Sequence, residues 1–226
     1  MKLSKRYQEA MKGIDRAKSY TVDEAVQTLK GLPSAKFDET VEIAFHLGVD
    51  PKKPDQAVRG TISLPKGIGR SLRVVVFAEG ELAAKAKAAG AQEAAGQELI
   101  DRVTGGWTDF DVAIAAPAMM RQVGRLGRIL GPKGLMPSPK SGTVTDDIEN
   151  AVREFRAGKL EYRTDSGGNV HAPVGRKSFP PEDLKANIEA MIERIRQAKP
   201  SSAKGRYIVG VSLSTTMGPG LRLAVS

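Results

Sequence analysis

The chain of 226 residues contains no cysteine, which excludes disulfide bonds, thiolate nucleophiles and zinc sites built on thiolates. Its two histidines, His46 and His171, lie far apart and belong to no cluster with the spacing of metal ligands. Aromatic residues make up only 5% of the chain, which argues against the base-stacking platform of a protein that binds single-stranded nucleic acid. We therefore expect no metal and no cofactor.

Long apolar runs are also missing. The longest strongly apolar run, Val74 to Phe77, is far shorter than the roughly 18 residues that a membrane-spanning helix needs. The first twenty residues mix cations with Glu9 and Asp15, and no apolar segment is followed by a small-residue cleavage site. We expect a cytoplasmic protein that has no export signal and does not associate with a membrane.

The motifs of common enzyme classes are absent. GPKGLMP at 131–137 lacks the spacing of a phosphate loop, and FAEGEL at 77–82 has one glycine where a dinucleotide site needs three. No G-x-S-x-G elbow occurs, and Asp146 with Asp147 is explained as the start of a helix. The sequence predicts no catalysis, although a triad assembled in space stays open, as does an enzyme whose Arg and Lys tract binds a phosphorylated substrate.

Basic residues outnumber acidic ones by 35 to 26, which gives a net charge of +9 and predicts a polyanionic partner such as nucleic acid. Two tracts, 112–145 and 194–226, carry cations and no carboxylate, as suits contact with a phosphate backbone. In the first tract the arginines recur at helical spacing, and a solvated helix face is the alternative explanation. The cations are Arg121, Arg125, Arg128, Lys133 and Lys140 in the first tract, and Arg194, Arg196, Lys199, Lys204, Arg206 and Arg222 in the second.

The segment Lys36–Asp50 alternates apolar and polar residues, broken only at Glu39, and predicts a half-buried strand. Its polar face is either solvated or in contact with a ligand. The alternating segment Val58–Leu64 is predicted to pair with it as a hairpin, and a second hairpin is predicted around Gly167 and Gly168. Between these hairpins, residues 67–159 alternate apolar strands with helices, a pattern typical of a parallel α/β unit. GAQEAAG at 90–96 is where that unit needs a further strand.

Several helices are predicted from periodicity and end signals. One spans residues 3–12, and a second begins at the capping box of Thr21 and Glu24. The others are a continuous helix over 119–130, a helix capped by Thr145 that stops at Gly158, and a helix that follows the prolines at 180–181.

We therefore predict a mixed α/β and α+β protein of two domains. Residues 1–66 and 160–226 form a split α+β domain with a mainly antiparallel sheet, and residues 67–159 form an inserted α/β, Rossmann-like domain. The two linkers between them carry Gly67, Gly69 and Gly158, which predict a hinge.

The segment STTMGPG at 214–220 has the composition of an RNA contact. The hydroxyls of residues 214–216 can hydrogen-bond phosphates or ribose 2′-hydroxyls, and Met217 can pack on a base. Gly218 and Gly220 allow a close approach of the backbone. A polar turn before an edge strand is the alternative explanation.

Four motifs together resemble the bacterial form of the ribosomal protein L1 family: KFDETVEIAFHLGVDPKKPDQAVRGTISLP, LGRILGPKGLMPSPKSGTVT, GNVHAPVGRKSF and STTMGPG. The resemblance covers essentially the whole chain. It implies a protein of the mobile rRNA stalk of the large subunit, beside the tRNA exit site, which also binds its own mRNA as a repressor. It further implies contact with tRNA leaving the ribosome and a monomer off the ribosome. GAQEAAG departs from the family pattern, which places a more apolar strand there.

The resemblance also implies RNA-binding residues, all in the split domain. They are Lys36, Phe37, Thr40, Glu42, Gly167, Gly168, His171, Ser212, Thr216, Met217 and Gly218.

Overall fold

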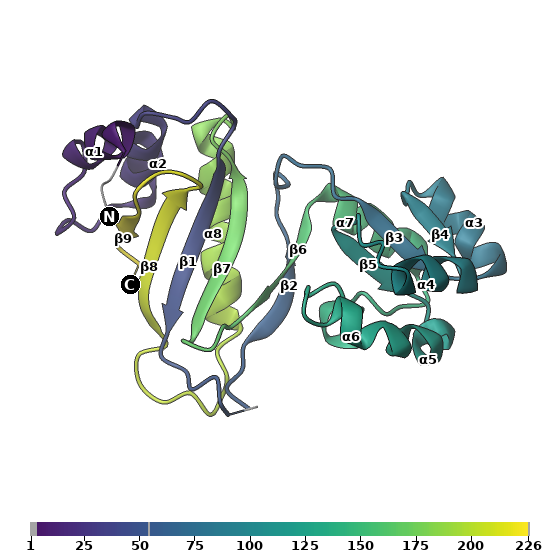
Figure 1. Cartoon of the computed structure of the whole chain (residues 1–226). Helices are drawn as coiled ribbons and strands as arrows, with labels where there is room; N and C mark the ends of the chain where they lie inside the picture. Colours follow the sequence, from purple (N-terminus) through teal and green to yellow (C-terminus); the bar gives the residue numbers. More distant parts are fainter. Residues whose placement is uncertain (1–3, 54, 226) are drawn as a thin grey trace. The chain divides into compact units, whose positions relative to one another are not determined.

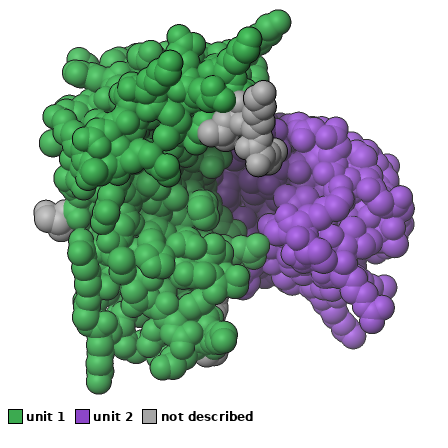
Figure 2. All heavy atoms as spheres, turned by 60° about the vertical axis from the view of Figure 1, so that its left-hand side comes forward, with its two compact units in different colours: residues 1–69, 160–226 green, residues 70–159 purple. Residues whose placement is uncertain are grey.

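The computed structural model describes residues 4–53 and 55–225, so that Leu3 of the predicted first helix, Pro54 and Ser226 lie outside the described residues. The chain divides into two compact units, residues 1–69 with 160–226 and residues 70–159 (Figures 1 and 2). We call them the split unit and the inserted unit. Each has a hydrophobic core of its own. The first division falls after Gly69, three residues later than we predicted, and the second falls after Lys159.

The split unit is built on a four-stranded antiparallel sheet in the order β7-β1-β8-β9 (Figure 1). Period two is confirmed in β1, where Val41, Ile43, Phe45 and Leu47 are all buried. The strand begins at Thr40 rather than Lys36, because the preceding residues turn away into a loop. The strands are β1 (Thr40–Leu47), β7 (Asn169–Arg176), β8 (Ile208–Thr215) and β9 (Leu221–Leu223).

The predicted hairpin between β1 and the next strand is wrong. β2 (Arg59–Ser63) pairs instead with β6 (Lys159–Arg163) in a separate two-stranded sheet. β2 cannot join β1, because both edges of β1 are already paired with β7 and β8. The second predicted hairpin is correct only at its turn, where Thr164 bridges Val170, and beyond it β6 and β7 enter different sheets.

Helices cover one face of the four-stranded sheet. The capping box of Thr21 and Glu24 is confirmed at the start of α2, with both of its hydrogen bonds present. α2 and α8 bury apolar side chains against the sheet, among them Leu29, Ile188 and Met191. Among the described residues of the split unit, no helix covers the opposite face of the sheet (Figure 1). The helices of this unit are α1 (Lys5–Lys12), α2 (Val22–Gly31) and α8 (Pro181–Gln197).

The inserted unit has a three-stranded parallel sheet in the order β4-β3-β5. The strand expected in GAQEAAG is present as β4, although it is short and poor in β-formers. Helices pack on the sheet through apolar side chains that include Leu99, Val103 and Phe155. A Rossmann-like arrangement stays a prediction. The elements are β3 (Val74–Phe77), α3 (Gly80–Ala88), β4 (Glu93–Ala95), α4 (Gln97–Thr104), β5 (Val112–Ala115) and α7 (Ile148–Ala157).

The helix predicted over 119–130 is divided into short pieces, because glycines at 124 and 127 interrupt it and 3₁₀ turns replace α-helical ones. Its apolar side is nevertheless buried as expected. The pieces are η1 (Pro117–Met119), α5 (Met120–Val123), η2 (Gly124–Leu126) and α6 (Gly127–Leu130), and a further 3₁₀ turn, η3, spans Pro139–Ser141. The predicted cap of α7 is also wrong. Asp147, not Thr145, accepts the capping hydrogen bond, from the N–H of Asn150.

Candidate nucleic-acid interface

The uncovered face of the four-stranded sheet carries polar side chains that lie in register across neighbouring strands. Since paired strands are about 4.8 Å apart, each row places its side chains side by side over a distance of ~15 Å or less. Glu42 and His171 on this face are exposed, and Ser212 belongs to β8, which lies between β1 and β9. One row is His171, Ala44, Ser212 and Arg222, and the next is Pro173, Glu42 and Ser214.

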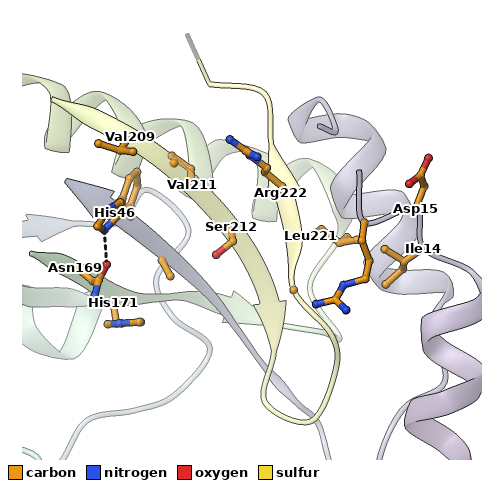
Figure 3. Close-up of a pocket in the computed structure, with 15 residues that line it drawn as sticks. Ile14, Asp15, His46, Asn169, His171, Val209, Val211, Ser212, Leu221 and Arg222 are labelled. Atoms are coloured by element: carbon orange, nitrogen blue, oxygen red, sulfur yellow. Dashed lines mark hydrogen bonds between the residues drawn. The ribbon is translucent and has the colours of Figure 1, made fainter. Parts of the chain in front are cut away.

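A hollow of about 480 Å³ lies on this face (Figure 3). Two residues that we predicted to bind RNA, His171 and Ser212, line it, and the cations Arg16 and Arg222 contribute to its wall. His46, on the same side of β1, forms a hydrogen bond of 2.8 Å between its Nδ1 and Asn169 Oδ1 (Figure 3). The carboxylate of Asp15 also lines it, so the hollow combines charges of both signs with hydrogen-bonding groups, as suits a ribose or a base edge as well as a phosphate.

Large apolar side chains are exposed at this same sheet. Among the described residues they are Phe37, Val209 and Met217, which are 53%, 36% and 49% exposed. Phe37 precedes β1, and Met217 follows β8. Val209 lies on β8 where the pairing register with β1 shifts, and such a bulge can turn a side chain outward. Phe37 and Met217 lie at the same end of the sheet, where two exposed apolar side chains indicate a binding surface, whereas Val209 lies near the opposite end.

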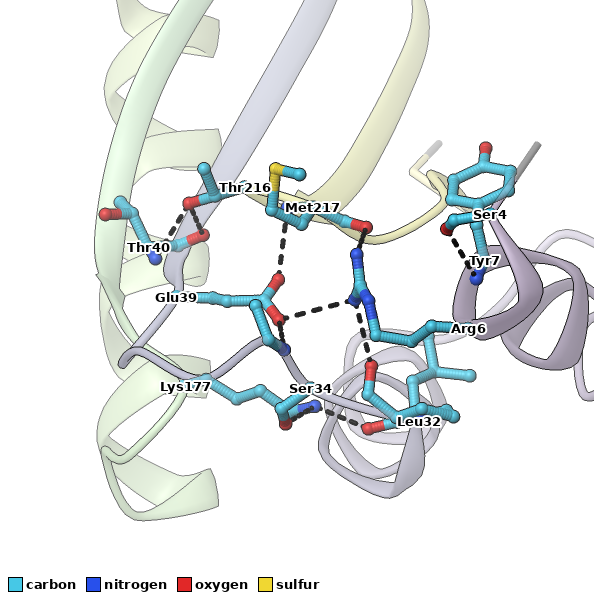
Figure 4. Close-up of polar contacts among 12 residues, drawn as sticks. Ser4, Arg6, Tyr7, Leu32, Ser34, Glu39, Thr40, Lys177, Thr216 and Met217 are labelled. Atoms are coloured by element: carbon cyan, nitrogen blue, oxygen red, sulfur yellow. Dashed lines mark hydrogen bonds and ion pairs between the residues drawn. The ribbon is translucent and has the colours of Figure 1, made fainter. Parts of the chain in front are cut away.

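Thr40 and Thr216 join the loop after β8 to the start of β1 (Figure 4). The N–H of Thr40 donates to Thr216 Oγ1 at 3.0 Å, and this hydroxyl donates in turn to the Thr40 carbonyl at 3.3 Å. The N–H of Thr216 also donates to the Thr40 carbonyl, at 3.0 Å. Because the proton of the hydroxyl is used inside the protein, Thr216 can offer an RNA only its remaining acceptor lone pair.

Gly167 and Gly168 form the turn before β7, at the far end of β1 from Thr216. The carboxylate of Asp165 accepts from the N–H groups of Asn169 and Gly167, which lowers the pKa of Asp165. Gly168 has a φ of +77° and its carbonyl accepts from the N–H of Leu47 at 3.0 Å, so that glycine is needed for the turn itself.

The residues predicted to bind RNA thus fall into three places, and their role stays a prediction. Two of these places are the opposite ends of the sheet, which the length of β1 separates by ~23 Å, and the other is its open face. A glycine is required at position 218 by the fold itself, because a Cβ there would lie 2.3 Å from Thr215 Oγ1. At one end of the sheet are Lys36, Phe37, Thr40, Thr216, Met217 and Gly218, on its open face are Glu42, His171 and Ser212, and at the other end are Gly167 and Gly168.

The predicted hinge glycines all have positive φ, with values of 63° at Gly67, 70° at Gly69 and 114° at Gly158. Gly158 ends α7 in the left-handed conformation. Buried Asn187, which sequence reasoning missed, accepts from the N–H of Lys66 at 3.0 Å and donates to the Gly67 carbonyl at 2.8 Å. The first linker is therefore fastened to α8 up to Gly67, and the hinge itself stays a prediction.

The arginines predicted to form a stripe, Arg121, Arg125 and Arg128, are all exposed and form no ion pair with any described residue. The side chain of Lys140, in the same tract, lies outside what is described. The structure also contains, in residues 4–53 and 55–225, no group of three or more carboxylates and histidines that could hold a metal ion. In the same residues no helix is both long and apolar enough to cross a membrane.

The sequence reasoning missed Arg16 and Asn169 in the hollow. Two other residues of the hollow could have been found from the sequence: Arg222 belongs to a tract without carboxylates, and His46 lies on the polar side of the predicted strand. Arg16 had no such signal, because it reaches the sheet from the connection between α1 and α2.

Comparison with known proteins assigns the chain. Residues 28–219 match the model of the family described as Ribosomal protein L1p/L10e. A relative from Kosmotoga olearia, the large ribosomal subunit protein uL1, is 57% identical over 222 residues, which cover 98% of this chain and 96% of the relative. A family match over most of the chain and this degree of identity lead to the same assignment, and the chain belongs to the ribosomal protein L1 family.

Proposed function

We propose that this protein is a cytoplasmic structural component of the large ribosomal subunit that binds the rRNA stalk near the tRNA exit site. Its family consists of ribosomal structural proteins rather than enzymes. The proposed contact surface is the open face of the four-stranded sheet together with the loops 35–38 and 216–218, which we call the RNA face.

The observation that carries this proposal is the position of the exposed apolar side chains. Phe37 follows the exposed cation Lys36 in the loop before β1, Met217 lies in the loop after β8 at the same end of the sheet, and Val209 borders a hollow with two arginines. Flat or polarisable apolar groups can pack on bases, while neighbouring cations neutralise phosphates. This combination supports recognition of a folded RNA by its shape and backbone.

Glu42 distinguishes this surface from a simple polycation. Its side chain is exposed on the middle strand, and an ionised carboxylate can only accept hydrogen bonds. A phosphate would be repelled there, so the partner must supply a donor, such as a ribose 2′-hydroxyl or an amino group on a base edge. Glu42 therefore supports a contact that reads RNA structure.

We include two further RNA partners in the proposal. The protein's own mRNA would bind the same RNA face, so that only protein in excess over rRNA would be free to act as a repressor. The tRNA leaving the ribosome would find positive charge on the inserted unit at Arg121, Arg125 and Arg128, which are exposed and free of ion pairs with described residues. Off the ribosome the protein would be a monomer.

The test is binding of the purified protein to three RNAs: the stalk rRNA fragment, the leader of its own mRNA, and an unrelated duplex of equal length. We expect the first two to compete for one site and to bind at least tenfold more tightly than the duplex, with stalk nucleotides protected from chemical probing. Equal affinity for all three RNAs at each salt concentration would refute the proposal. Strong binding of a small phosphorylated ligand instead would favour the enzyme alternative.

A further inference from the structure

Glu39 is a buried carboxylate in a position where the alternation of β1 calls for an apolar residue. Its side chain is 1% exposed. One carboxylate oxygen accepts from the N–H of Ala35 at 2.6 Å, and the other accepts from the N–H of Met217 at 3.1 Å (Figure 4). A buried carboxylate is stable only when it is well hydrogen-bonded, so these two backbone groups must stay in place for the unit to keep its structure.

Arg6 of α1 completes the arrangement from the other side. Its guanidinium lies 3.7 Å from Glu39 Oε1 and donates to the Met217 carbonyl at 2.9 Å and to the Pro33 carbonyl at 3.3 Å (Figure 4). Glu39 thus holds the N–H of Met217 while Arg6 holds its carbonyl. The backbone of Met217 is fixed on both sides, although its side chain remains exposed.

The same pair fixes the loop that carries Phe37. Glu39 holds Ala35 and Arg6 holds Pro33, while the N–H of Lys177 donates to the Glu39 carbonyl at 2.8 Å. The two loops therefore share one buried carboxylate, and each presents one large exposed apolar side chain. Neither Phe37 nor Met217 is held by burial of its own side chain.

Charge favours the ionised form of Glu39. Burial by itself would raise its pKa, but hydrogen bonds from the Ala35 N–H, the Thr215 hydroxyl and the Met217 N–H, with the charge of Arg6, lower the pKa overall. The carboxylate is consequently an anion at neutral pH.

We propose that Glu39 and Arg6 are positioning residues that set both loops of the RNA face before RNA arrives, and that α1 thereby belongs to the RNA-binding apparatus. The inference rests on the proposed function. Ordering two loops during folding removes that entropy loss from the binding step, which is the general gain from preorganisation. Without Arg6 or Glu39 we expect the stalk RNA to bind about tenfold more weakly.

The test compares Arg6→Met and Glu39→Gln with the control Lys12→Met. Lys12 lies in the last turn of the same helix, is exposed and forms no side-chain hydrogen bond or ion pair with described residues of either loop, so the control removes one positive charge from α1 without touching the loops. Three quantities are measured: affinity for the stalk RNA, its dependence on salt, and hydrogen exchange of the Ala35 and Met217 amides in the free protein.

We expect Arg6→Met and Glu39→Gln to lower affinity about tenfold, to leave the salt slope unchanged and to speed exchange at both amides. Lys12→Met should change affinity less than twofold. The double variant should lose little more than either single variant, because both act through one arrangement. If Glu39→Gln does not fold, Arg6→Met decides, since Arg6 is partly exposed.

Two outcomes would overturn the inference. An Arg6→Met variant that binds within twofold of the original protein shows that the loops need no positioning. A loss of affinity together with a salt slope lower by about one, and unchanged amide exchange, shows that Arg6 contacts a phosphate directly. Failure of the unsubstituted protein to prefer stalk RNA over the duplex would instead refute the proposed function.

Discussion

Replacement of Thr216 by valine separates reading of RNA structure from attraction by net charge. Valine keeps the shape of threonine and removes the hydroxyl, so the Thr40 N–H loses its acceptor at 3.0 Å and the Thr40 carbonyl loses a donor at 3.3 Å. Because this region is exposed, water can replace both partners, and the free energy of unfolding should fall by only ~0.5–1 kcal/mol. The N–H of Thr216 still donates to the Thr40 carbonyl.

The effect on RNA binding should be larger. We expect that in the complex the hydroxyl oxygen of Thr216 accepts from a ribose 2′-hydroxyl at a contact from which water is excluded, so that valine would leave that donor unpaired. An unpaired buried donor costs about 1–3 kcal/mol, which corresponds to a loss of affinity of roughly 5- to 150-fold. Thr216→Ser retains the oxygen and serves as the matched control, with an expected loss below about threefold.

The assay is equilibrium binding of each variant to the stalk RNA and to an unrelated duplex, at several salt concentrations, with urea unfolding to measure stability. Weakening by Thr216→Val should appear on the stalk RNA alone and should not alter the salt slope. Equal weakening on both RNAs, or none, would contradict the assignment of 216–218 to the RNA face and favour a polar turn.

Four further predictions concern other parts of the molecule. Lys36→Ala should reduce the salt slope of RNA binding by about one and weaken binding to all RNAs alike, and a loss confined to stalk RNA would contradict a phosphate contact. Replacement of residues 70–159 by a short glycine linker between Gly69 and Leu160 should leave a folded split unit that binds stalk RNA. A loss of more than about 3 kcal/mol in the free energy of binding would show that the inserted unit is a principal contact. The buried hydroxyl of Tyr207 has no hydrogen-bond partner among the described residues, and burial raises its pKa to about 12. Tyr207→Phe should therefore change the free energy of unfolding by only ~0 to +1 kcal/mol. Marked destabilisation in urea unfolding would reveal a hidden partner. The pKa of Glu39 is lowered below its ordinary 4.5 in the folded protein, so its contribution to stability is complete above pH 4.5 and is lost as the pH falls further. Glu39→Gln should therefore flatten the fall in the free energy of unfolding at acid pH. An unchanged fall would mean that other carboxylates cause it.

Periodicity predicted the core face of the sheet but not the neighbours of its strands. The alternation of β1 follows from side chains that point to opposite faces, and it can be read without knowing the partner strands. The partners are set by pairing with residues more than 120 positions away, such as Ala44 with His171 and Ser212. The local rule that consecutive strands form hairpins therefore gave the wrong partner for β2.

Glu39 illustrates the same limit at the candidate site. In the sequence it is the one charged residue on the apolar side of the alternation, and it looked like an interruption of the pattern. In the structure it continues the buried side, because Arg6 and Met217, from both ends of the chain, supply the partners it needs. No local pattern contains that information. Composition singled out the segment 214–220 as an RNA contact, whereas the other RNA-binding residues are implied by family resemblance, because the alternation of a strand does not distinguish a solvated face from one that binds a ligand.

The insertion of one unit within the other also determines the order in which the protein can form. β1 is synthesised before the inserted unit, but its neighbours β7 and β8 follow it. At about 5–20 residues per second, residues 70–159 take roughly 5–20 s to synthesise. Throughout that time both edges of β1 lack their partner strands, and α8 is not yet available to cover its apolar face. The inserted unit consists of consecutive residues and can form its own core as soon as it is made. A nascent chain at this stage has no RNA face, and we expect it to depend on shielding from aggregation until β8 is made.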